Sequence, residues 1–148
     1  MPATIERREY VQVHPVQAIH PFHAVMLAAT VPLFLGALLS DWAYWRTYHI
    51  QWANFSSWLL AGALVFGAVA LLFAVFGLFT RHGRGARRLL YTLLLLATWV
   101  LGFVNALIHA KDAWAVMPTG LVLSVIVTLL ACAATWAGFS TLRAGAAS

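Results

Sequence analysis

The sequence contains few charged residues and a single cysteine. Charged side chains make up 9% of the 148 residues, and only four of them are acidic, whereas soluble domains carry about 25%. This scarcity excludes an ordinary water-soluble domain. Because Cys132 is the only cysteine, an intrachain disulfide and a paired-cysteine site are also excluded. Its position inside an apolar run is typical of a cysteine that acts as a small hydrophobe.

The sequence also lacks the motifs of familiar enzymes. It contains no nucleophile–base–acid set and no HExxH motif. Residues 80–88 (T-R-H-G-R-G-A-R-R) lack the preceding strand and the following Lys-Ser/Thr of a phosphate-binding loop. His20 and His23 are three residues apart and supply only half of a zinc site. We therefore predict no catalytic residues, metal or cofactor, and favour a protein that is not an enzyme.

The sequence is instead rich in long apolar runs. Hydrophobic residues make up 63% of the chain and the mean hydropathy is +0.86, which is typical of a membrane protein. We predict spans at 21–40, 55–79, 89–109 and 117–139, each near the length that crosses a bilayer. The expected fold is an all-α, up-and-down bundle of four transmembrane helices in one domain, residues 20–143. Residues 1–19 should form an interfacial arm and 144–148 a tail.

The distribution of basic residues predicts the orientation. The net charge of +5 does not indicate nucleic-acid binding, because the basic residues lie in short segments between apolar runs. Two lie in the predicted outer loops, Arg46 and Lys111, and the other seven of the nine lie on the opposite side. Such a bias places both termini in the cytoplasm. The aromatic segment 42–52 is predicted to be an interfacial loop.

Small residues repeat at helical spacing along the second span. They follow steps of four, three, four and three, which place them on one helical face, and Gly102 takes a similar place in the third span. In lipid, such a face lets a neighbouring helix approach closely. The predicted helix-packing residues are Ala63, Gly67, Ala70, Ala74, Gly77 and Gly102.

Polar residues gather on the faces of the first and third spans. Polar groups are costly in hydrocarbon, so these faces should turn toward protein or a wet cavity. The topology then predicts an outer polar cluster of Asp41, Asn54, Asn105, His109 and Asp112. An inner polar cluster should contain His20, His23, His82 and Tyr91. Within the outer cluster, His109 could pair with Asp41 or Asp112, and Asn105 with backbone or Ser124.

Three functions are compatible with these clusters. The first is a structural or accessory subunit of a membrane complex, either a homo-oligomer or bound to another protein. The second is an electron-transfer protein that binds b-type haem or quinone, since haem requires two histidines at one depth. Its ligands would be His20 or His23 with His82, or His49 with His109. The third is a proton or small-solute pathway formed by an oligomer.

Several motifs resemble a known bacterial family. They are I-H-P-F-H (19–23), V-P-L-F-L-G-A-L-L-S-D-W-A-Y (31–44), N-A-L-I-H-A-K-D-A-W (105–114) and A-T-W-A-G-F-S (134–140). Over residues 18–143 the chain resembles the predicted inner-membrane proteins that carry domain of unknown function 2231. The resemblance implies four membrane helices, the bacterial inner membrane and no established activity. Some relatives are joined to haem-c or iron–sulfur modules. Many have a second histidine five residues after the first, whereas His23 follows His20 by three.

Overall fold

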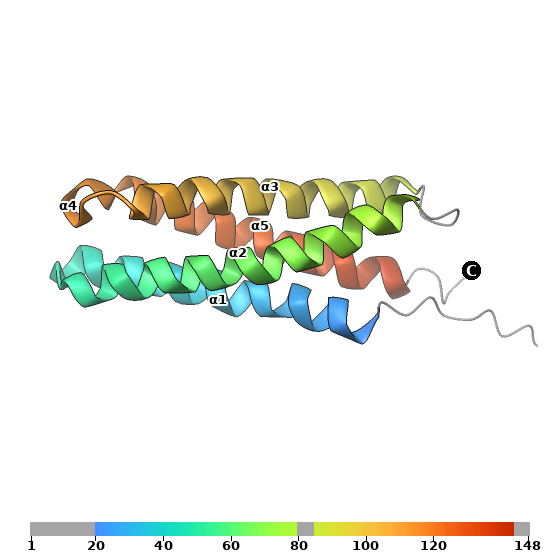
Figure 1. Cartoon of the computed structure of the whole chain (residues 1–148), viewed down its shortest axis with the longest axis horizontal. Helices are drawn as coiled ribbons and strands as arrows, with labels where there is room; N and C mark the ends of the chain where they lie inside the picture. Colours follow the sequence, from blue (N-terminus) through green and yellow to red (C-terminus); the bar gives the residue numbers. More distant parts are fainter. Residues whose placement is uncertain (1–19, 80–84, 144–148) are drawn as a thin grey trace, which may run out of the picture.

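The computed structural model describes residues 20–79 and 85–143, which form four long helices and one short helical turn (Figure 1). The elements are α1 (Pro21–Thr47), α2 (Ile50–Phe79), α3 (Ala86–His109), α4 (Ala113–Val116) and α5 (Thr119–Arg143). No strand occurs in these two ranges. The predicted arm 1–19, the tail 144–148 and His82 lie outside the described residues.

The four long helices are long and apolar enough to cross a membrane. Their outward faces carry large apolar side chains, such as Leu39, Val65, Leu107 and Leu129, each more than half exposed. A surface of this kind is stable in lipid and would be unfavourable in water. The predicted fold, an all-α bundle of four membrane helices, is therefore confirmed.

Each long helix packs against two others. α1 lies against α2 and α5, and α3 also lies against α2 and α5. The helices thus form a four-sided bundle in which α1 and α3 occupy opposite corners, with successive helices antiparallel (Figure 1). We call the end that carries α4 and the α1–α2 turn the α4 end. The other end, where α1 begins and α5 ends, is the terminal end.

The prediction of a loop over 42–52 was wrong. α1 continues to Thr47 and α2 begins at Ile50, so that only two residues connect them. The segment contains no Pro or Gly to interrupt a helix, and its aromatic side chains are accommodated on helices that reach the interface. Tyr48 ends α1 in the left-handed conformation (φ 52°), and its N–H bonds to the Tyr44 carbonyl, as in many helix C-caps.

Small residues allow the helices to pack closely. Ala63, Gly67, Ala70 and Ala74 are all buried along α2. Gly102 of α3 is also buried, and a Cβ built there would lie 3.0 Å from Cζ of Phe34. Gly77 differs, because a Cβ there would meet nothing within 4 Å. Two clusters of apolar side chains fill most of the interior, and buried polar side chains lie among them, with the largest group near the α4 end.

Candidate functional site

A buried polar network joins all four long helices near the α4 end. Asp41 comes from α1, Ser56 from α2, Asn105 and His109 from α3, and Ser124 from α5. All five residues are at most 9% exposed, and Asp41 and Asn105 are completely buried. Such a group in a membrane interior must satisfy its hydrogen bonds within the protein.

Asp41 is the acceptor at the centre of this network. Its Oδ1 lies 2.8 Å from Nε2 of His109, and its Oδ2 accepts a 2.5 Å hydrogen bond from the Ser124 hydroxyl. Ser124 Oγ in turn accepts a 2.8 Å bond from Nδ2 of Asn105. A directed chain therefore runs from the amide through the hydroxyl to the carboxyl group. Oδ1 of Asn105 is enclosed and has no partner among the described residues.

The geometry around His109 fixes the charge of the pair. Its Nδ1 lies 2.9 Å from the backbone carbonyl oxygen of Asn105, which can only accept, so Nδ1 must carry a hydrogen. The hydrogen between Nε2 and Asp41 then belongs either to an imidazolium beside a carboxylate or to a neutral carboxyl group. The pair as a whole is neutral in both arrangements, which lowers the cost of burying it.

Ser56 also belongs to this network, although it was not predicted from the sequence. Its Oγ lies 3.3 Å from Nε2 of His109 and donates to the Ala37 carbonyl, also at 3.3 Å. The signal was present in the small-residue repeat of α2. Extending that repeat back from Ala63 in helical steps of three and four reaches Leu60 and Ser56, both of which are buried.

Two predicted members of the outer cluster lie outside it. Asn54 is exposed, because it is two positions from Ser56 and so lies on a nearly opposite face of α2. Asp112 is exposed as well. Asp112 was predicted from its helical spacing to His109. Because α3 ends at His109, that spacing does not apply to Asp112. His109 therefore pairs with Asp41.

The predicted inner cluster contains one buried pair. Nε2 of His23 lies 2.8 Å from the hydroxyl of Tyr91 inside the terminal end. His20 is instead exposed and caps the start of α1, where its Nδ1 accepts a 3.3 Å bond from the Phe22 N–H. Like Asp41 and His109, the residues His23 and Tyr91 belong to α1 and α3. Two polar pairs thus connect opposite corners of the bundle through its centre.

A comparison with family models identifies the protein family. A model described as "Predicted membrane protein (DUF2231)" matches residues 19–143, which include all four long helices and both polar pairs. The chain belongs to the DUF2231 family. No curated protein and no solved structure matches it. The DUF2231 description names a membrane protein and no activity, and the four candidate spans make it a multi-pass one.

In this DUF2231 protein, the four histidines of the described residues already have partners or lie apart. Both nitrogens of His109 are engaged, and Nε2 of His23 is bonded to Tyr91, while His49 is exposed next to the α1–α2 turn. Binding of haem by His23 through Nε2, or by His109, would therefore require one of these bonds to break. Within residues 20–79 and 85–143, no three His, Cys, Asp or Glu side chains are grouped as metal ligands.

Proposed function

We propose that this protein is a non-enzymatic subunit of a complex in the bacterial inner membrane, with both termini in the cytoplasm. The observation that carries the proposal is the network around Asp41. Its polar groups bond mainly to one another, and they connect all four helices. Such a network fixes the register and pairing of helices, a role for which buried polar groups are known.

The outward surface supports the same proposal. Partner binding inside a membrane needs a rigid helix face rather than a cleft, because packing and not water exclusion drives association there. Exposed apolar residues cover the outward faces of all four helices. The seven basic residues on the side of the termini support the cytoplasmic orientation.

Photo-crosslinking in living cells tests the proposal. A photoreactive amino acid is placed at one lipid-facing position on each helix: Leu39, Val65, Leu107 or Leu129, all more than half exposed. Leu60, which is fully buried and closer in size to the photoreactive side chain, is the control position. We expect a discrete protein adduct from one helix face and none from Leu60. The protein is also extracted together with its surrounding lipid, as nanodiscs, from cells that express it at the native level. These nanodiscs should contain the same partner or a second copy of this chain.

The opposite result is equally clear. If none of the four positions gives a protein adduct and the excised nanodiscs contain only one copy of the chain, the protein acts alone and the proposal is wrong. Accessibility of a tag added to each terminus, measured in intact and opened cells, tests the orientation separately. Labelling of both tags in intact cells would reverse the proposed topology.

A further inference from the structure

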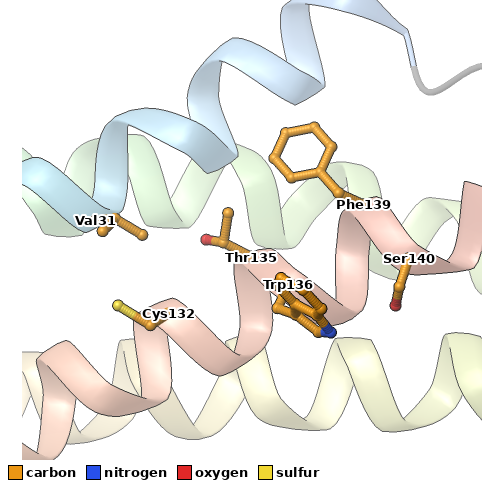
Figure 2. Close-up of a pocket in the computed structure, with 6 residues that line it drawn as sticks. All are labelled: Val31, Cys132, Thr135, Trp136, Phe139 and Ser140. Carbon is orange, nitrogen blue, oxygen red and sulfur yellow. The ribbon is translucent and has the colours of Figure 1, made fainter.

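A cavity opens between α1 and α5 on the lipid-facing side of the bundle. Its volume is about 350 Å³, near the lower end of small-molecule sites, which range from roughly 300 to 1,000 Å³. Most of its lining is apolar. The wall is formed by Val31 of α1 and, on α5, Cys132, Thr135, Trp136, Phe139 and Ser140 (Figure 2).

Thr135 is unusual among the threonines of the helices. The hydroxyls of Thr92, Thr98 and Thr128 each donate to the backbone carbonyl four residues earlier. The Thr135 Oγ1 is enclosed and has no partner among the described residues. A hydroxyl in hydrocarbon has no water to bond, so an unmade bond here is costly. Thr135 and Phe139 are directed toward α1, across the cavity (Figure 2).

The depth of Thr135 restricts what could accept this bond. Thr135 lies about 8 Å along the helix axis from the middle of the candidate span Thr119–Ser140. A span centred in the bilayer has a hydrocarbon half-thickness of about 15 Å, so Thr135 lies well inside it. Phospholipids carry their oxygen atoms at the edge of this layer. A lipid-phase molecule that supplies an acceptor at the depth of Thr135 must therefore be one whose polar atoms dissolve in hydrocarbon.

The neighbouring side chains indicate the shape of that molecule. Trp136 and Phe139 lie one and four positions after Thr135, and both line the cavity. Aromatic rings at this position offer faces and edges for packing against a planar ring. A cavity of this size holds a ring with small substituents, while a long apolar tail would extend into the bilayer.

From these observations we propose that the α1–α5 cavity binds the ring of a prenylated quinone. Rotation of the Thr135 side chain about χ1 turns its enclosed hydroxyl into the cavity, where a quinone carbonyl accepts its hydrogen bond. Trp136 and Phe139 then pack against the ring. The isoprenoid tail leaves through the open side between the helices. This site is separate from the Asp41 network, which lies toward the α4 end, and its test is independent of whether the protein has a partner.

Photolabelling tests the site directly. The full-length protein is reconstituted in phosphatidylcholine nanodiscs and irradiated with an azido-benzoquinone that bears a ten-carbon tail. The competitor is the corresponding quinone without the azide, with every ring position substituted so that it forms no adduct with the Cys132 thiol. We expect the label to concentrate on residues 131–140. The competitor should remove it.

Three variants separate binding from folding. Thr135→Val keeps the shape of the side chain, and it should raise the quinone concentration needed for competition roughly three- to tenfold. Thr135→Ser keeps a hydroxyl, so the quinone should compete at the same concentration as in the unaltered protein. Thr98→Val is the matched control, because its hydroxyl is bonded to the backbone within α3, and it should bind as the unaltered protein does. Thermal unfolding of each variant confirms that the bundle is intact.

Two outcomes would overturn the proposal. The first is a label spread over all four helices, or one that is unaffected by Thr135→Val in a folded protein. The second is equal competition by a saturated fatty-acid methyl ester of the same length, which would show that the cavity takes an acyl chain without recognising a quinone ring.

Discussion

His109 and Asp41 lie on opposite corners of the bundle, yet His109 Nε2 is 2.8 Å from Asp41 Oδ1. α1 and α3 are not packing neighbours, so this pair joins them through the centre. His23 and Tyr91 make the second such connection, also at 2.8 Å, near the other end. Between the two pairs the interior is filled mainly by apolar side chains, such as Phe34, Leu60 and Leu95. The pairs therefore fix the position of the opposite helices at two depths.

Replacement of His109 by leucine should strongly destabilise the protein. The substitution leaves the Asp41 carboxyl group buried and without its partner, which costs about 3–5 kcal/mol for a buried pair. Unfolding in detergent, followed by circular dichroism, measures the change. His49→Leu is the matched control because His49 is exposed, and it should have little effect. Equal stability of the two variants would show that Asp41 does not depend on His109.

The double variant Asp41→Leu/His109→Leu should be more stable than either single variant. Each single change leaves one polar group unpaired, whereas the double change replaces the pair by apolar side chains, which is often neutral. A double-mutant cycle from the same unfolding measurements gives the coupling energy, which should be at least about 1 kcal/mol for residues in contact. Additive effects of the two substitutions would contradict the coupling.

Loss of the Tyr91 hydroxyl should have a smaller effect. Tyr91→Phe keeps the ring and removes the bond to His23, and hydrogen bonds between membrane helices average about 0.6 kcal/mol. We expect a reduction of that size in the free energy of unfolding. Tyr48→Phe serves as the control, since Tyr48 is 52% exposed at the α4 end. A loss above about 3 kcal/mol would exceed the contribution of one hydrogen bond and would contradict this description of the pair.

The sequence was sufficient to predict the four helices and the end of the bundle at which Asp41 and His109 lie, but it left Asp41 and Asp112 open as partners of His109. Asp41 and His109 lie on polar faces at helical spacing, and alternating helix direction brings them to the same end. Asn54 and Ser56 show where this reasoning failed. Ser56 lies inside the predicted span 55–79, but the small-residue repeat was followed back only to Ala63, and Asn54 was placed just before a span that in fact starts at Ile50. With the correct start, the buried face contains Ser56 and excludes Asn54.

The choice of acid partner for His109 depended on the end of α3. Asp112 would share the polar face only if the helix continued for another turn, but α3 ends at His109 and the chain then turns into α4. Residues 105–112 contain neither Pro nor Gly to predict this end. The contact between His109 and Asp41 also requires α1 to lie diagonally opposite α3, which depends on the packing of all four helices.

Two glycine substitutions should have opposite effects on stability. A Cβ at Gly138 would lie 2.7 Å from Cδ2 of Leu27 and 2.9 Å from Cε2 of Tyr91. Both neighbours are buried and have little room to move, so Gly138→Ala should cost about 1–3 kcal/mol. At Gly77 an added Cβ meets nothing within 4 Å, so Gly77→Ala should stabilise α2 by up to about 1 kcal/mol.

Unfolding of both variants in the same detergent measures this difference. Alanine keeps the Gly77 carbonyl that accepts a 3.3 Å bond from Arg88 Nη1, so no hydrogen bond is removed in this control. If Gly138→Ala is as stable as Gly77→Ala, the helices near Tyr91 must be further apart than described. The His23–Tyr91 bond would then lack the close packing of α5 that holds the Tyr91 ring in place.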